Sequence, residues 1–317
     1  MNLRMTLAAV GLAGALALPA GATPVVIQNG FVQAGVSDSG TLGSNGNTSP
    51  GILYDPTGSG SYGINDFLTP GSPFEGLYVS AAGYYDSANN ECVGGGYNEG
   101  PCGFTKTSPT SGSGTTAGWT GSDGTLSVTN NYSLTTLGGK SVIAITTSLT
   151  NISGGLLSGV DFLRTLDPDP DVNAHGSFFT NNALFSVASA NDEACGTGPD
   201  TGETICIISE DSGYTHQAGV SGGTNACEDT VWDITPSHWL SPCLLNDGDG
   251  DYSIGEAFSL GDLGAGDTDT LTYDYVLGGT LETASGPPTP TGVPEPGSAM
   301  LLLSSLMGLG VLRRRRK

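Results

Sequence analysis

Two aspartate-rich loops could bind a cation. The first contains Asp167, Asp169 and Asp171, and the second contains Asp247, Asp249 and Asp251. Carboxylate oxygens at alternate positions of a tight loop suit Ca²⁺. The second loop is not an EF-hand, because Tyr252 and Phe258 stand where that motif has Gly and Glu. We therefore predict two separate, irregular calcium loops, with a solvated acidic turn as the alternative for each; no other cofactor is predicted.

Two tryptophans could contact a sugar. Trp232 and Trp239 flank His238 in a loop that Cys227 and Cys243 would close. An exposed indole ring offers a flat apolar face on which a sugar ring can stack. The alternative is that both rings belong to the core, because tryptophan is buried on average.

Six cysteines lie between the two ends of the chain. An even number of cysteines in an exported chain indicates disulfides rather than metal ligands. No C-x-x-C pair occurs, and the histidines stand at no familiar zinc spacing. Pairing of sequence neighbours predicts the disulfides Cys92–Cys102, Cys195–Cys206 and Cys227–Cys243.

Signals for catalysis are weak. The chain has three histidines, His175, His216 and His238, and neither a G-x-S-x-G nucleophile elbow nor a P-loop. A serine–histidine–aspartate group assembles in space, so spacing along the chain does not exclude one. We predict that the protein is not an enzyme, and a secreted hydrolase is the weakest alternative.

The elements that would position these residues are strands. Leu271, Tyr273, Tyr275 and Leu277 alternate with polar residues, which is the period of a half-buried strand. Similar stripes within residues 124–166, with a Gly-Gly turn at 138–139, predict a three-strand antiparallel meander. Residues 25–28, 31–36, 76–85, 178–187 and 204–209 are further predicted strands.

The composition predicts the fold class. The chain has 51 glycines and no long helical period between its ends. These features favour an all-β fold, a large antiparallel β-sandwich with long Gly-rich loops, with a signal helix and a single transmembrane helix added at the N- and C-terminus. Segments 150–153, 159–162, 167–169 and 260–266 weakly resemble turns of bacterial surface β-sandwich domains. That resemblance implies a fold and no activity.

The N-terminus has the pattern of a secretory signal peptide. Arg4 precedes an apolar run over residues 7–18, and Ala20-Gly21-Ala22 follows. A basic start, a short apolar run and small residues at the cleavage site define such a peptide. We predict that residues 1–22 are removed by signal peptidase.

The C-terminus reads as a membrane stop behind a short motif. A linker at residues 286–293 leads to Val293, Pro294, Glu295 and Pro296 and then to the uncharged run 297–312. The chain ends in a basic cluster consisting of Arg313, Arg314, Arg315, Arg316 and Lys317. The positive-inside rule places this cluster in the cytoplasm and the rest of the chain outside.

Residues 293–317 resemble the PEP-CTERM sorting signal, because motif, apolar helix and Arg-rich end occur in that order at the extreme C-terminus. The resemblance implies that a membrane enzyme called exosortase recognises the Pro-Glu-Pro and removes the tail. It also implies release or attachment at the cell envelope, often in bacteria that make exopolysaccharide. It implies nothing about the exported domain, residues 23–285.

Charge excludes one class of partner. Between the two ends the chain has three basic residues, Lys106, Lys140 and Arg164, against 30 acidic ones, a formal charge of −27. Such a domain repels nucleic acid phosphates.

We predict a non-catalytic exported protein of the cell envelope or extracellular matrix, anchored by its tail before processing. The alternative is a carbohydrate-binding surface module that depends on calcium and has extracellular polysaccharide as its partner.

Overall fold

The structure is a computed structural model and describes residues 24–43, 49–69, 75–92, 100–186, 192–209, 211, 213–228, 232–241 and 245–288. Strands dominate this part of the chain, and neighbouring strands within each sheet pair antiparallel. The all-β prediction is therefore confirmed. The predicted signal helix and transmembrane helix lie outside the described residues. Among the described residues, no helix has the length and apolar character needed to cross a bilayer.

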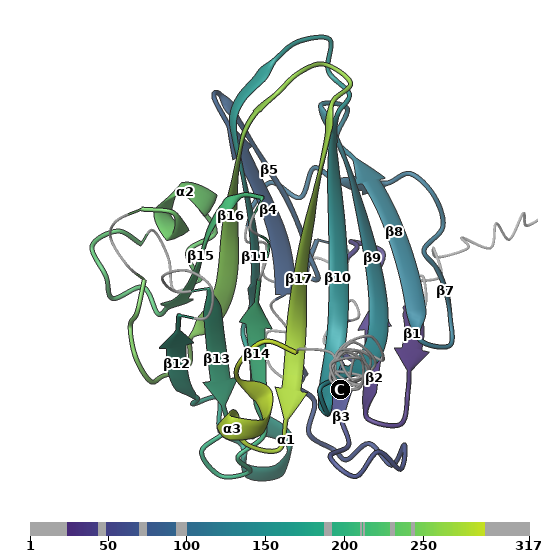
Figure 1. Ribbon diagram of the computed structural model, residues 1–317, viewed down its shortest axis with the longest axis vertical. Helices are drawn as coiled ribbons and strands as arrows, with labels where there is room; N and C mark the ends of the chain where they lie inside the picture. The colour runs from purple at the N-terminus through teal and green to yellow at the C-terminus, as the bar shows by residue number, and fades with distance from the viewer. Residues whose placement is uncertain are drawn as a thin grey trace, which may run out of the picture.

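Two large sheets form the body of the fold (Figure 1). The nine-stranded sheet contains, in spatial order, β12 (Asn181–Phe185), β13 (Glu193–Thr197), β14 (Thr204–Ile208), β17 (Thr268–Gly278), β10 (Lys140–Asn151), β9 (Leu126–Leu137), β8 (Thr116–Ser122) and β6 (Thr105–Lys106), and β7 (Ser111–Ser113) also pairs with β8. The five-stranded sheet contains β15 (Thr215–Ser221), β16 (Ser253–Leu263), β11 (Leu157–Leu166), β4 (Glu75–Ala81) and β5 (Tyr84–Asn89).

Smaller elements complete the fold. A three-stranded sheet contains β1 (Val25–Gln28), β2 (Val32–Val36) and β3 (Ile52–Tyr54). It is joined to the β7–β8 hairpin by a hydrogen bond from the Gln28 amide to the Gly114 carbonyl. Three single-turn helices are α1 (Val172–His175), α2 (Pro236–Trp239) and α3 (Leu281–Ala284).

The hydrophobic core lies between the two large sheets. Phe162 of β11, Phe258 of β16 and Tyr273 of β17 meet there, with ring centroids 5.8–6.3 Å apart. The alternating stripe of β17, Leu271 to Leu277, is buried as predicted. Face-to-face packing of two sheets explains the alternation, because only one side of β17 faces the core.

The predicted meander is half correct. Strands β9 and β10 form a hairpin, and both turn glycines, Gly138 and Gly139, have positive φ, as a tight two-residue hairpin turn requires. Strand β11, however, does not pair with β10 but crosses to the other sheet. Asn151 stabilises this crossing, since its side-chain amide donates to the carbonyls of Gly155 and Leu263.

Two other strand predictions need correction. Residues 76–85 were predicted as one strand, but they span the β4–β5 hairpin, which turns at Gly83 with φ +74°. Strand β8 lies in a segment that was not among the predicted strands. Gly118 and Gly121 give that strand little β propensity, and pairing with β9 stabilises it instead.

A buried polar network links the two sheets. Glu75 of β4 lies against Arg164 of β11, and both side chains are fully buried. The Tyr275 hydroxyl of β17 donates to Glu75 at 2.8 Å, and the Arg164 guanidinium donates to the Tyr132 hydroxyl of β9 at 3.0 Å. Burial raises the pKa of Glu75, while the Arg164 charge opposes that shift. These residues were not predicted to interact, because they are far apart in the sequence.

Candidate functional site

The disulfide predictions are confirmed where the structure describes both cysteines. Cys92 is bonded to Cys102 and Cys195 to Cys206. Cys227 is also disulfide-bonded, and its predicted partner Cys243 lies outside the described residues. These bonds indicate that the chain folds in an oxidising compartment, as an exported protein would.

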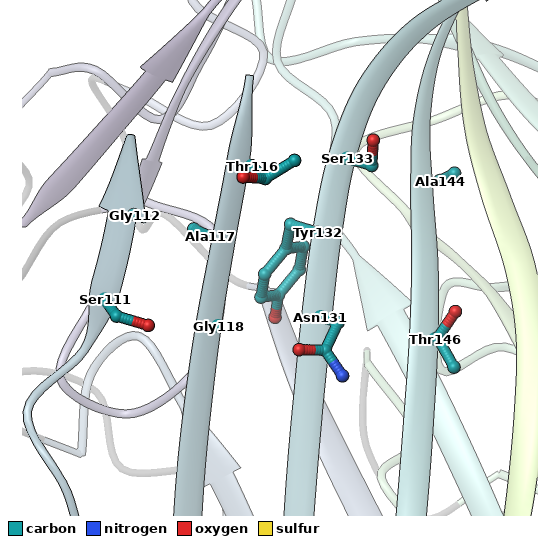
Figure 2. Close-up of a pocket in the computed structure, with 10 residues that line it drawn as sticks. All are labelled: Ser111, Gly112, Thr116, Ala117, Gly118, Asn131, Tyr132, Ser133, Ala144 and Thr146. Carbon is teal, nitrogen blue, oxygen red and sulfur yellow. The ribbon is translucent and has the colours of Figure 1, made fainter. Parts of the chain in front are cut away.

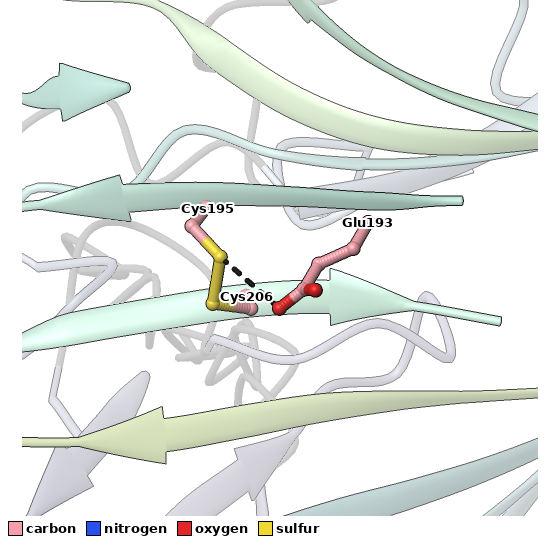
Figure 3. A group of neighbouring side chains, drawn as sticks. All are labelled: Glu193, Cys195 and Cys206. Atoms are coloured by element: carbon pink, nitrogen blue, oxygen red, sulfur yellow. Dashed lines mark hydrogen bonds between the residues drawn. A yellow bond between two sulfur atoms is a disulfide. The ribbon is translucent and has the colours of Figure 1, made fainter. Parts of the chain in front are cut away.

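One group that resembles a metal site is structural. Figure 3 shows the Glu193 carboxylate beside the disulfide between Cys195 and Cys206. Because both sulfurs are bonded to each other, neither can supply a thiolate to a metal. The carboxylate instead accepts the Gly286 amide at 2.8 Å, which fixes the residues that follow α3.

The two acidic loops converge at one place. Asp167 and Asp169 follow β11, and Asp251 precedes β16, the antiparallel neighbour of β11. One carboxylate oxygen from each of the three residues lies within 4.8 Å of those from the others. This corrects the prediction of two separate calcium loops, because a single group combines residues from both. Asp167 and Asp169 are buried and Asp251 is exposed.

The other three predicted ligands have a different role. Asp171 accepts the backbone amides of Asp200 and Thr201. Asp247 accepts those of Gly222 and Thr224, and Asp249 accepts that of Asn182. These three carboxylates shape their own loops, and the structure does not bring them to the group formed by Asp167, Asp169 and Asp251.

The electrostatics of this group are unfavourable for three free carboxylates. Burial, and then the negative charge of Asp251, raise the pKa of Asp167 to about 7. Burial, followed by the charges of Asp167 and Asp251, raises the pKa of Asp169 to about 10. The Trp232 indole donates a hydrogen bond to Asp167 at 3.1 Å. Burial raises these pKa values because a carboxylate loses its hydration when water is excluded.

The two tryptophans are placed differently. Trp239 is 1% exposed, and its indole donates to the Asp233 carbonyl at 2.7 Å. The prediction that Trp239 offers an exposed ring to a sugar is therefore wrong, since it packs against β16 and β15 near Gly255 and Gly219. Trp232 is half-buried and packs at the edge of the small buried cluster that contains Trp239, Tyr78 and Leu163. Its indole contacts Asp167.

Two histidines pair with carboxylates. His216 Nδ1 lies 2.8 Å from Glu256 Oε1, and the ring stacks on Phe258. His238 Nδ1 lies 3.1 Å from Asp233. In a hydrolytic site, a serine or cysteine would contact such a histidine. His216 instead lies between Glu256 and the ring of Phe258.

The outer side of the nine-stranded sheet carries a regular array of short polar side chains. Strands β8, β9, β10 and β17 lie in register there, and their outward residues align in four rows across the sheet. We call these residues the hydroxyl face. The rows are Ser122, Ser127, Thr150 and Thr268; Thr120, Thr129, Ser148 and Thr270; Gly118, Asn131, Thr146 and Thr272; and Thr116, Ser133, Ala144 and Asp274.

Neighbouring hydroxyls on this face contact one another. Ser148 and Thr270 lie 2.9 Å apart, Thr150 and Thr268 2.8 Å, and Thr120 and Thr129 3.1 Å. Each hydroxyl can donate one hydrogen bond and accept others. The polar halves of these strands were visible in the sequence as Thr and Ser at alternate positions. Their alignment was not, because it depends on the pairing of β10 with β17.

A shallow cavity of about 420 Å³ lies at one side of the hydroxyl face (Figure 2). Its lining includes Thr116 and Gly118 of β8, Asn131 and Ser133 of β9, and Thr146 of β10. Gly118 lies directly opposite Asn131. Because Gly118 has no side chain, the sheet surface is hollowed at that position. The lining offers hydroxyl and amide groups and carries no charge.

Comparison with known proteins gives no family for this chain. It matches no protein-family model and no curated protein. A bacterial glucoamylase solved in complex with acarbose is similar over 83% of this chain and 33% of its own, at 10% identity and a TM-score of 0.48. A putative aldose 1-epimerase from Escherichia coli K12 is similar over 81% and 99%, at 12% identity and a TM-score of 0.38.

A TPR-domain-containing protein from Parabacteroides distasonis is similar over 82% of this chain and 48% of its own, at 12% identity and a TM-score of 0.40. This chain thus spans about a third of the glucoamylase and half of the TPR-domain protein. At such identities and TM-scores, these similarities carry no inference about ligand or activity.

The predicted sorting signal remains a prediction from the sequence. Val293 to Pro296 and the basic cluster from Arg313 to Lys317 lie outside the described residues. Their assignment rests on the sequence.

Proposed function

We propose that the protein is a non-catalytic, exported component of the cell envelope or extracellular matrix whose hydroxyl face binds a neutral polysaccharide. Export and sorting follow from the sequence of the two ends, with signal peptidase and an exosortase as processing enzymes. The observation that supports the binding role is the regular array of mostly Ser and Thr, with one charged residue at its corner, on β8, β9, β10 and β17.

The charge distribution supports a neutral ligand. The exported domain has 30 acidic residues, yet of the sixteen positions of the hydroxyl face only Asp274, at one corner, is charged. An acidic polysaccharide would be repelled by the surrounding surface, whereas a neutral one would not. Hydroxyl and amide side chains can both donate to and accept from sugar hydroxyls.

The shape supports a long ligand rather than a small molecule. Strands lie about 4.8 Å apart, and outward residues repeat about every 6.8 Å along a strand. Four strands and four rows therefore make an extended flat surface. Each neutral hydrogen bond adds only about 0.5–1.5 kcal/mol. Useful affinity would come from many contacts along one chain, which a polymer provides.

The binding role can be tested by affinity electrophoresis in gels that contain neutral or anionic polysaccharides. We expect the protein to be retarded by a neutral polymer, and the double variant Asn131→Glu/Thr146→Glu to run unretarded. The matched control is Ala174→Glu/Ser237→Glu, which adds the same charge at exposed positions on α1 and α2, outside the nine-stranded sheet. Equal retardation of both double variants would show that the hydroxyl face is not the binding surface.

The sorting role has a separate test. Replacing Pro294, Glu295 and Pro296 by alanine should leave the full C-terminal tail on the protein in cells, measured as a larger intact mass in the membrane fraction. Replacing three residues of the preceding linker by alanine is the control. An unchanged processed mass in the motif variant would contradict sorting by this signal.

A further inference from the structure

The group formed by Asp167, Asp169 and Asp251, which we call the carboxylate site, is a consequence of strand pairing. In the register of β11 with β16, Leu166 lies opposite Ile254. The chain leaving β11 and the chain entering β16 therefore meet at the same end of the five-stranded sheet. Any polar residues just beyond that pair are brought together.

Two oxygens of the carboxylate site are buried without a partner. Asp167 and Asp169 are 4% and 1% exposed, and Oδ1 of each has no hydrogen-bond partner among the described residues. Buried carboxylate oxygens normally accept hydrogen bonds, and an unsatisfied one is costly. Asp171 and Asp247 show that this chain does satisfy loop carboxylates with backbone amides. The unsatisfied oxygens therefore need another partner.

The basic residues of the chain do not supply it. Within the described residues, Lys106 pairs with Asp38, Lys140 donates to the Ala284 carbonyl, and Arg164 pairs with Glu75. The carboxylate site is thus a cluster of acidic groups that receives no counter-charge from Lys or Arg side chains in the described part of the protein.

We propose that the carboxylate site binds one calcium ion. Its ligand atoms are all oxygens, which hard divalent cations prefer, and Ca²⁺ accepts six to eight of them in irregular geometry. The exposed Asp251 gives the ion a path from solvent, and water can fill the remaining positions. Through Asp167, the ion would also hold Trp232 and its loop against the end of the sheet. This site is separate from the hydroxyl face, because it belongs to the other sheet.

Trp232 provides a specific way to detect the ion. Terbium(III) replaces calcium in oxygen sites and becomes luminescent when a nearby tryptophan transfers excitation energy to it. The Trp232 indole lies 3.1 Å from the Asp167 carboxylate. With EDTA-treated protein we expect terbium luminescence on excitation at the indole band, displaced by calcium. Titration calorimetry with CaCl₂ should give one site, with a Kd of about 10⁻⁴–10⁻³ M, as in extracellular calcium modules.

The key variant is Asp169→Asn, with Asp200→Asn, an exposed residue on another loop, as the control of equal charge. At 10 mM calcium we expect the melting temperature of the wild type and of Asp200→Asn to rise by roughly 3–10 °C. Asp169→Asn should lose that rise and the terbium signal. In EDTA, however, it should melt above the wild type, because an amide is always neutral and avoids the cost of burying the Asp169 carboxyl group, which must either keep its charge or take up a proton on folding.

These opposite shifts separate a binding defect from a folding defect. A variant that merely failed to fold would melt below the wild type in EDTA. The proposal is overturned if calcium leaves the wild-type melting temperature unchanged, or if Asp169→Asn responds to calcium as Asp200→Asn does. The second result would mean that calcium acts on the acidic surface in general.

Discussion

Two sets of buried carboxylates lie next to β11, and they differ in whether the chain supplies a positive charge to balance them. Glu75 faces Arg164 within the core, and its oxygens accept hydrogen bonds from Tyr275 and the Leu42 amide. Asp167 and Asp169, just past the end of β11, keep unpartnered buried oxygens. The cation for Glu75 is part of the chain, and for the carboxylate site it must be taken from solution. The comparison teaches that burial alone does not reveal the role of an acidic residue; its partners do.

The largest expected effect comes from removing the internal cation. Arg164→Leu should lower the free energy of unfolding by about 3–5 kcal/mol, because it leaves Glu75 buried without its counter-charge. Urea unfolding measures this loss. The double variant Arg164→Leu/Glu75→Gln should recover a large part of it, since the stranded charge is then gone. A cost below 1 kcal/mol for the single variant would show that Glu75 is not held as an anion.

Asp66, another buried carboxylate, sharpens the comparison, because backbone amides satisfy it. Asp66 is 1% exposed and accepts the amides of Gly51, Ile52 and Leu68 at 2.7–3.0 Å. Asp66→Asn should destabilise the protein by about 2–3 kcal/mol, because charge-assisted hydrogen bonds are lost. In EDTA the same substitution at Asp169 should stabilise it. If Asp→Asn had the same sign at both positions, the distinction between satisfied and unsatisfied carboxylates would fail.

How much of these sites the sequence can predict depends on the range of the interaction. Local patterns were enough for β17, whose stripe from Leu271 to Leu277 follows from period two, and for the β9–β10 hairpin with its Gly-Gly turn. The two disulfides close short loops, so pairing of sequence neighbours identified them.

Contacts between distant strands were not predictable in this way. The sequence marks Asp167, Asp169 and Asp251 as acidic loop residues, but only the β11–β16 register brings them together. The buried Glu75–Arg164 pair depends in the same way on β4 pairing with β11. Trp239 was misjudged because α2 folds its loop back onto the sheet, which a short polar sequence does not indicate.

A pH titration tests a further buried acidic residue, Glu256, whose partner His216 can itself lose a proton. Burial raises the pKa of Glu256 to about 8 despite the nearby imidazole. The pKa of His216 is raised by Glu256 and also by Asp192 and Asp211, against the effect of burial. The folded pair therefore holds protons to higher pH than the unfolded chain does. Stability conferred by His216 is complete below about pH 6.5 and is lost as the pH rises through the raised pKa of the folded imidazole. In the unfolded chain Glu256 ionises from about pH 4.5, whereas in the folded protein it keeps its proton to about pH 8, so stability falls over that range as well.

Both contributions have the same sign, so stability should fall as pH rises from about 5 to 8, by up to about 1.4 kcal/mol per pH unit for each proton. The measurement is urea unfolding of the wild type and Glu256→Gln across this range. The difference between the two isolates the pair from other acidic groups. A wild type that gained stability relative to Glu256→Gln on going from pH 6 to pH 8 would contradict this assignment.

The smallest effect on stability is expected where polar groups are exposed, at the hydroxyl face. Thr270→Val removes the hydroxyl that contacts Ser148 but keeps a β-branched side chain, so unfolding should change by no more than about 0.5 kcal/mol. Retardation by a neutral polysaccharide should weaken roughly 2- to 10-fold, which corresponds to one lost hydrogen bond. Thr215→Val, at an exposed position of β15 in the other sheet, is the control and should bind normally. Equal binding by the two variants would remove Thr270 from the binding surface.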